Sequence, residues 1–100
     1  MSEYRPDAWV ILRIEDTYKI LGGWIGGFAE GDVWRLNSGI SHIDLDGDIY
    51  SVYGYTGSVY YVHKDCQRMT MLMSSMYNYW KENSVLNIEI VDIEECMGDL

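Results

Sequence analysis

Residues 40–55 read ISHIDLDGDIYSVYGY and predict the best-defined local structure of the chain. Two runs of β-branched and aromatic residues flank Asp46-Gly47, a dipeptide that tolerates the two positive φ values of a type I′ turn. We therefore predict a β-hairpin over residues 40–55. Thr56-Gly57 marks another tight reversal, and Ser58–His63 continues the same composition, so the middle of the chain is expected to be an antiparallel meander.

Further strands are expected on both sides of this hairpin. Ala8–Glu15 (AWVILRIE) alternates apolar and polar residues towards its end, the period of a strand with one buried face. Tyr18–Leu21 is expected to return from a turn at Asp16-Thr17. Val33–Leu36 predicts a short strand, and the β-branched run Val85–Ile93 predicts the last one.

The sequence period becomes helical after Asp65, a residue suited to an N-cap. From Cys66 to Trp80, the apolar side chains fall within one arc of about 160°, with Met71 as the exception among the polar residues. This pattern predicts one amphipathic helix at about residues 66–82, with Cys66 packed against the sheet. The predicted fold is α+β: a single domain, residues 1–100, in which this helix covers an antiparallel sheet of about five to six strands.

The charge of the chain restricts its partners. There are 16 acidic and 7 basic residues, which gives a net charge of −9, and no Lys or Arg lies between residues 36 and 63. Such a chain repels nucleic-acid phosphates and anionic membranes but suits docking on a basic protein surface. With no apolar run long enough to span a bilayer and no secretory signal pattern, we expect a cytoplasmic protein with reduced cysteines.

Three motifs resemble known functional sites, but the details of each motif do not support that function. The acids of residues 44–48 resemble the start of an EF-hand, but the glycine falls at the fourth loop position, and Tyr55 occupies the twelfth, where the ligand Glu belongs. His63 lies close to Cys66 in sequence, as the base of a cysteine nucleophile would. Cys66 belongs to the apolar arc, however, and a thiol packed against the sheet cannot reach a substrate. The glycine-rich segment Gly22–Gly31 matches no phosphate-binding pattern. We expect no catalytic residue, cofactor or metal.

The glycine-rich segment instead carries large apolar side chains, which require either burial or an outside partner. Aromatic residues on loops are frequent anchors of protein interfaces. Acids near the hairpin turn are expected to guide the approach of a basic partner, and the C-terminal acids Glu89, Asp92, Glu94, Glu95 and Asp99 form a second acidic group. The predicted partner contacts are Trp24, Phe28, Trp34, Tyr55, Met71, Asp44, Asp46 and Asp48.

Two segments resemble a group of uncharacterised small proteins of tailed bacteriophages. These are WRLNSGI at residues 34–40 and YGYTGSVYYVHK at residues 53–64, within a likeness that covers about residues 8–64. Those relatives often carry a cysteine where this chain has Val62. The resemblance implies a viral origin but no mechanism, and it transfers no functional residue.

Together these features predict a small acidic phage accessory protein that binds and inhibits or redirects a host protein, for example one of a defence system. Two alternatives remain open. One is a small-molecule-binding domain that uses the Gly22–Gly31 loop as a pocket. The other is a structural virion component that self-associates, and the oligomeric state is open.

Overall fold

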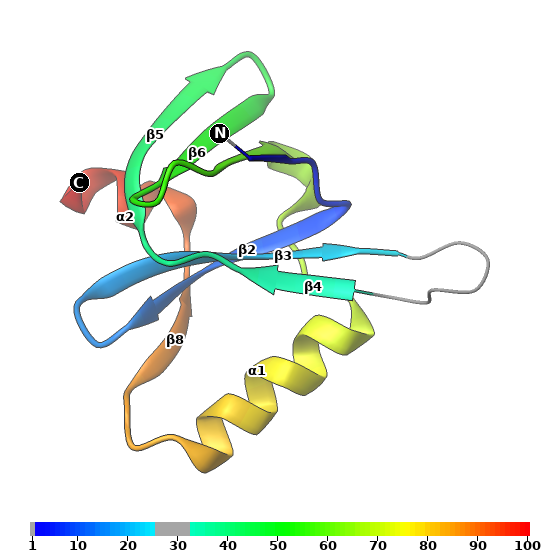
Figure 1. The fold of residues 1–100 in the computed structure, drawn as a ribbon, viewed down its shortest axis with the longest axis vertical. Coiled ribbons are helices and arrows are strands. Elements are labelled where there is room, and N and C mark those ends of the chain that lie inside the picture. The colour runs from blue at the N-terminus through cyan, green and yellow to red at the C-terminus, as the bar shows by residue number, and fades with distance from the viewer. Residues whose placement is uncertain (1, 26–32) are drawn as a thin grey trace.

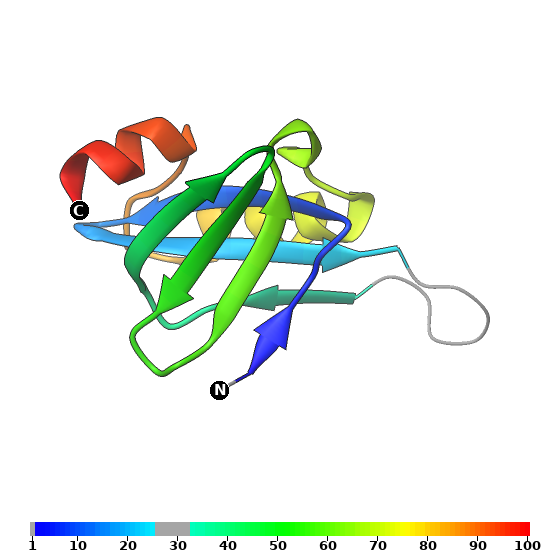
Figure 2. The ribbon, with the colours of Figure 1, turned by 90° about the horizontal axis from the view of Figure 1, so that it is seen from above.

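The computed structural model describes residues 2–25 and 33–100 and shows an α+β fold in three layers (Figure 1). Two four-stranded sheets are stacked, and helix α1 covers the far face of the second sheet (Figure 2). In chain order, the elements are β1 (Glu3–Tyr4), β2 (Ala8–Ile14), β3 (Thr17–Trp24), β4 (Val33–Leu36), β5 (Ile40–Asp46), β6 (Ile49–Gly54), β7 (Val59–His63), the 3-10 helix η1 (Lys64–Cys66), α1 (Met71–Asn83), β8 (Ile88–Val91) and α2 (Ile93–Asp99).

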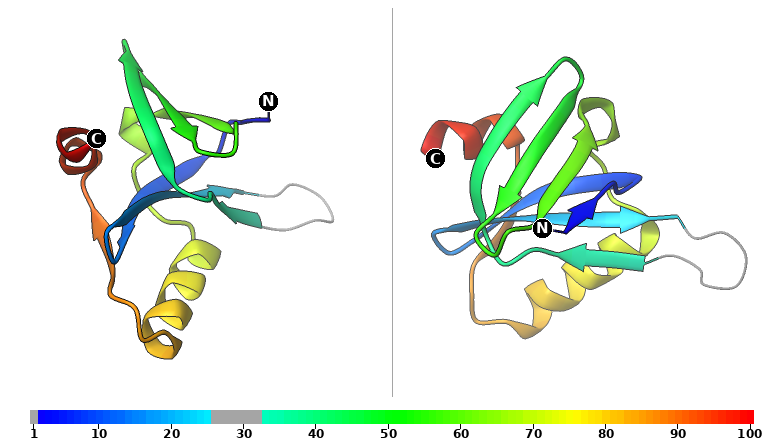
Figure 3. Two further views of the ribbon diagram at one scale, coloured as in Figure 1. Left: turned by 60° about the vertical axis from the view of Figure 1, so that its left-hand side comes forward. Right: turned by 45° about the horizontal axis from the view of Figure 1, so that its top comes forward.

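The strands divide between two sheets, so the prediction of one sheet of five to six strands is wrong. Sheet I has the order β1-β7-β6-β5, with β1 parallel to β7 and the other pairs antiparallel. Sheet II has the order β4-β3-β2-β8 and is antiparallel throughout. The α+β class and the mostly antiparallel pairing are confirmed. Figure 3 shows the β5–β6 hairpin standing over sheet II.

A buried asparagine holds the corner where the chain passes from sheet II to sheet I. The Asn37 side chain accepts a hydrogen bond from the Ile20 N–H at 2.9 Å and donates one to the Gly39 carbonyl at 3.2 Å. Gly39 has a φ of 150°, which favours glycine. Its carbonyl also accepts a hydrogen bond from the Tyr55 N–H at 3.1 Å. Residues 37–39 therefore end one sheet and begin the next.

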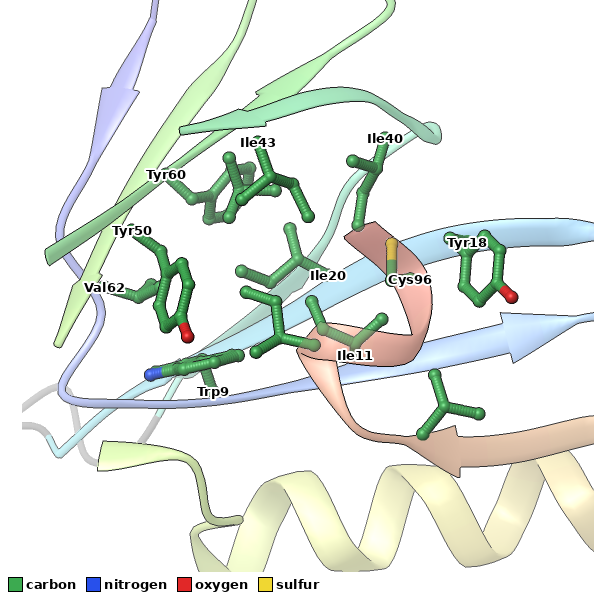
Figure 4. Close-up of a cluster of buried hydrophobic side chains, with 13 residues drawn as sticks. Trp9, Ile11, Tyr18, Ile20, Ile40, Ile43, Tyr50, Tyr60, Val62 and Cys96 are labelled. Carbon is green, nitrogen blue, oxygen red and sulfur yellow. The ribbon is translucent and has the colours of Figure 1, made fainter. Parts of the chain in front are cut away.

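Sheet II is the middle layer, and its strand β2 is buried on both faces. Val10 and Leu12 face α1, whereas Trp9 and Ile11 face sheet I in the core between the sheets (Figure 4). The expectation of one buried face therefore holds only for the end of this strand, where Arg13 is half-buried. A continuous apolar run at the start of β2 is the sequence signal of a strand covered on both sides.

Helix α1 begins at Met71, later than the predicted start at about residue 66. The Thr70 hydroxyl accepts a hydrogen bond from the Met73 N–H at 3.2 Å, so Thr70 is the N-cap and Asp65 is not. Lys64–Cys66 form η1 instead. Cys66 packs against the core between the sheets from this 3-10 turn, and its apolar character extended the helical pattern beyond the helix itself.

The C-terminal prediction is also corrected. The last strand is limited to Ile88–Val91, and a second helix, α2, follows it and begins at Ile93, the last residue of the range predicted as strand. Asp92 caps α2 by accepting a hydrogen bond from the Glu94 N–H at 3.0 Å. Ile93 and Cys96 pack into the core between the sheets. Of the β-branched residues in the predicted range, only Ile93 is helical, and Val85 lies before the strand, so the β-branched run extends beyond the paired residues at both ends.

The predicted hairpin over residues 40–55 is confirmed as β5–β6, but its turn differs. Asp46 pairs with Ile49, so the two-residue loop is Gly47-Asp48. Gly47 has a φ of 63°, and Asp48 is not among the described residues with positive φ. This pattern fits a type II′ turn, whose first central residue alone has positive φ, and contradicts the predicted type I′ turn at Asp46-Gly47.

Candidate functional site: an acidic groove

A groove with a volume of about 670 Å³ lies where the β2–β3 turn, β8 and the end of α2 meet. The start of β5 and the turn after β6 complete its walls. We call it the acidic groove. It is lined by Arg13, Glu15, Asp16, Thr17, Tyr18, Ile40, Tyr55, Asn87, Glu89, Asp99 and Leu100.

Negative charge dominates this lining, with four carboxylates from Glu15, Asp16, Glu89 and Asp99 against the one guanidinium of Arg13. An Arg13 Nη2 atom lies 2.5 Å from a Glu89 carboxylate oxygen, and its Nη1 lies 3.8 Å from Glu95. The carboxylate of Glu89 raises the pKa of Arg13, which stays charged. Because Arg13 is paired with β8 and α2, the groove as a whole remains negative and suits a cationic ligand.

The carboxylates are spread around the walls and do not converge on a point. Within residues 2–25 and 33–100, no group of three or more His, Cys, Asp or Glu side chains has the arrangement of a metal site. A single cation held by several carboxylates at 2–3 Å needs such convergence. The lining therefore fits a larger basic ligand, such as protein side chains, better than a metal ion.

Tyr18 fixes one wall of the groove. Its ring is buried in the core between the sheets, and its hydroxyl donates a hydrogen bond to the Asp99 carboxylate. This bond to Asp99 raises the pKa of Tyr18, since ionisation of the phenol would place two negative charges together. The contact ties the end of α2 to β3 and so holds Asp99 beside the β2–β3 turn.

Tyr55 stands at the rim with most of its side chain exposed. It is 72% exposed, although its N–H is fixed to the Gly39 carbonyl and its ring lies against Gly39. The β2–β3 turn opposite it contains Glu15 with a φ of 53°, followed by Asp16. The quadrupole of an aromatic ring attracts an ammonium or guanidinium group, and the negative charge of neighbouring carboxylates adds to this attraction.

The structure separates the two predicted tryptophan anchors. Trp34 pairs with Gly23 and Trp24 pairs with Val33, so the two indoles project from opposite faces of sheet II. Trp34 packs edge-on against Trp80, with the ring centroids 5.1 Å apart, beneath α1. Trp24 donates a hydrogen bond to the Arg5 carbonyl at 3.0 Å. They do not form one contact patch.

The other predicted contacts lie apart from both tryptophans. Met71, 84% exposed, is the first residue of α1. Asp44, Asp46 and Asp48 are exposed near the tip of the β5–β6 hairpin, where Asp44 bonds His42 at 2.7 Å and Asp48 pairs with Lys64 at 3.1 Å. Phe28 lies outside the described residues. Among the described members of the predicted set, Tyr55 alone lines the acidic groove.

Sequence reasoning missed the groove because its residues are distant along the chain. The sequence predicts Asp16 only as a turn residue and Tyr18 only as part of a strand. Glu89 and Asp99 were recognised as members of a C-terminal acidic group, but their partners across the groove were not. The nearest sequence signal is the pair Glu15-Asp16 at a hairpin turn, which by itself is typical of a solvated surface.

Within the described part of the chain, no helix combines the length and apolar character needed to span a membrane. Comparison of the chain with protein families, with curated proteins and with solved structures finds no match in any of the three.

Proposed function

We propose that this chain is a small acidic binding protein that docks on a basic surface of another protein through its acidic groove. The observation that carries the proposal is the groove itself: an open space of about 670 Å³ with four carboxylates, one paired arginine and the exposed ring of Tyr55. The resemblance to phage proteins makes a host protein, inhibited or redirected by this binding, the first partner to test.

The electrostatics favour this role in two ways. The net charge of −9 accelerates the encounter with a positively charged surface, and the groove supplies a local concentration of negative charge for final docking. An Arg or Lys side chain in the groove would have carboxylate acceptors around it and the face of Tyr55 against it. Binding of this kind weakens as salt screens the charges.

Affinity capture from bacterial lysate with charge-reversal variants tests the proposal. Asp16→Lys changes the groove, whereas Asp65→Lys makes the same charge change at an exposed acid in η1, outside the groove lining. We expect wild type and Asp65→Lys to recover the same stoichiometric partner. Asp16→Lys should bind that partner about tenfold more weakly in titration calorimetry at low salt, which corresponds to about 1.4 kcal/mol.

Tyr55→Ala provides a second, uncharged probe of the same site and should also weaken binding. Recovery of no stoichiometric partner at low or physiological salt would contradict the proposal. Equal affinities for Asp16→Lys and Asp65→Lys would show that general charge, and not the groove, attracts the partner.

A further inference from the structure

We infer that the partner contributes an extended basic segment that pairs with the free edge of β8 as a fifth strand of sheet II. This inference rests on the proposed function and specifies the kind of segment that the acidic side of the molecule accepts. Four observations carry it: the position of β8, the direction of its backbone groups, the chemistry of its two faces and the open space beside it.

Strand β8 is the last strand of sheet II and pairs with β2 on one side only. In Figure 3, it runs along the margin of the sheet. The Glu15 N–H donates to the Asn87 carbonyl at 2.9 Å, next to the first pair of this ladder. Hydrogen-bonded pairs alternate in an antiparallel ladder, so Glu89 and Val91 bond β2. The N–H and C=O groups of Ile88 and Ile90 therefore point to the free edge.

The side chains of β8 give this edge two different faces. Glu89 lies on the groove side, opposite Arg13, and the Arg13 guanidinium contacts the carboxylates of both Glu89 and Glu95. Ile90 lies on the α1 side, opposite Leu12, and remains 41% exposed. A segment with alternating residues would thus place Lys or Arg towards the acids and apolar side chains towards Ile90.

Space is available at the start of this edge. A second, shallow cavity of about 330 Å³ lies beside the start of β8 and is lined by Lys81 and residues 84–89. Asn87 and Glu89 border both this cavity and the acidic groove, so the two spaces adjoin at the start of β8.

Charge argues for a basic partner and against a second copy of this chain. Pairing two β8 edges would bring together two molecules of net charge −9, with Glu89 in each new interface. The edge strand β5 of sheet I is longer than β8, but it is protected by the exposed acids Asp44 and Asp46 and by an irregularity between Ile40 and His42. In β8 the sequence is IEIV, with one acid that faces the groove.

A labelled peptide of alternating Lys and Val tests the inference on the full chain. The control peptide has the same charge but carries backbone N-methyl groups on alternate residues, which removes strand pairing. Fluorescence anisotropy should show at least tenfold weaker binding of the methylated peptide. By NMR hydrogen exchange, the amides of Ile88 and Ile90 should be unprotected in the free protein and protected in the complex, whereas those of Glu89 and Val91 are protected in both.

Edge variants locate the site. Ile90→Pro removes an N–H that faces the open edge of β8. Leu45→Pro is the control on β5. Asp46 and Ile49 form the hydrogen-bonded pair that closes the hairpin, so the N–H of Leu45, which is 49% exposed, faces the open edge of β5. Ile90→Pro should weaken the Lys-Val peptide at least tenfold, and Leu45→Pro should bind it normally. Ile90→Lys, which keeps the backbone intact and repels a basic strand, should weaken it as well and covers the case that the proline variant does not fold.

Several results would overturn the inference. These are equal binding of the methylated peptide, unchanged exchange at Ile88 and Ile90 in the complex, or loss of binding in Leu45→Pro instead of Ile90→Pro. A concentration-dependent dimer in light scattering that Ile90→Lys abolishes would assign the edge to a second copy. If Asp16→Lys weakens a captured partner while the Ile88 and Ile90 amides stay unprotected, the groove proposal stands and only the strand pairing fails.

Discussion

At the scale of single residues, the two cysteines differ in environment and therefore in chemistry. Cys96 is fully buried in the core between the sheets, and desolvation there raises the pKa of its thiol to about 11. Asp99 and Glu95 add to this shift. Cys66 is half-buried in η1 at the margin of the same core. Cys96 is therefore a structural thiol that stays protonated in the native state.

This shift makes stability depend on pH above about 9. Because the folded-state pKa of Cys96 is raised from its ordinary value of 9.0, the unfolded chain loses the proton first as pH rises. The unfolded state then binds fewer protons, so the free energy of unfolding should fall between about pH 9 and 11, on the order of 2 kcal/mol in total. Urea denaturation at pH 8, 9 and 10 measures the slope at the start of this window.

Cys96→Ala is the control for that prediction. It lowers stability at every pH because it leaves a small cavity, but it should remove most of the decline between pH 8 and 10. A decline that is as steep in Cys96→Ala as in wild type would assign it to other groups, of which the buried Tyr60, whose pKa is raised by desolvation, is one.

At the scale of elements, the contact between β3 and α1 depends on one glycine. A Cβ at Gly23 would lie 2.3 Å from the Met73 Sδ and 2.8 Å from its Cγ, and the Met73 side chain is fully buried. The helix must move or Met73 must leave its position. We predict that Gly23→Ala lowers the free energy of unfolding by about 1–3 kcal/mol, the cost typical of overpacking a core.

Gly98→Ala is the matched control, because nothing lies within 4 Å of a Cβ at that position in α2. There the same substitution should raise the free energy of unfolding by up to about 1 kcal/mol through helix propensity. Chemical denaturation of both variants under one condition gives the comparison. If Gly23→Ala were neutral or stabilising, β3 and α1 could not be as close as described.

The same elements show what a local pattern can predict. The hairpin β5–β6, strand β4 and the body of α1 follow from periodicity and turn residues, which act over a few positions. The start of α1 was misplaced because Cys66 and Met69 continue its apolar period from outside the helix, each packing on a different core cluster. Helix α2 differs from the prediction although Asp92 followed three residues later by Glu95 is an N-cap signal, because the β-branched run before it favours a strand.

At the scale of the whole molecule, the division into two sheets and the acidic groove both escape sequence patterns. Alternation identifies a strand but not its neighbours, and the corner at Asn37 that separates the sheets resembles any polar turn. The groove unites Asp16, Tyr55 and Asp99, which meet only after the sheets stack and α2 folds back. The excess of acids and the exposed Tyr55 were foreseeable as separate features, but their proximity was not.

The uneven charge of the molecule leads to the last prediction. At a net charge of −9, mutual repulsion opposes folding, so raising NaCl from about 0.02 M to about 0.5 M should increase the thermal midpoint. Asp46→Lys and Asp48→Lys each change the charge from −9 to −7, and Gly47 alone separates the two sites. Asp48 pairs with Lys64, whereas Asp46 has no ion-pair partner among residues 2–25 and 33–100.

General repulsion alone predicts equal stabilisation in both variants. Because Asp48→Lys also breaks the pair with Lys64 and places two ammonium groups together, we expect Asp46→Lys to raise the midpoint and Asp48→Lys to leave it unchanged or lower it at low salt. The difference between the variants should shrink at 0.5 M NaCl, where the Debye length falls to about 4 Å. If the two variants were equally stable at low salt, net charge alone would govern stability at this hairpin, and the Lys64 pair would contribute nothing.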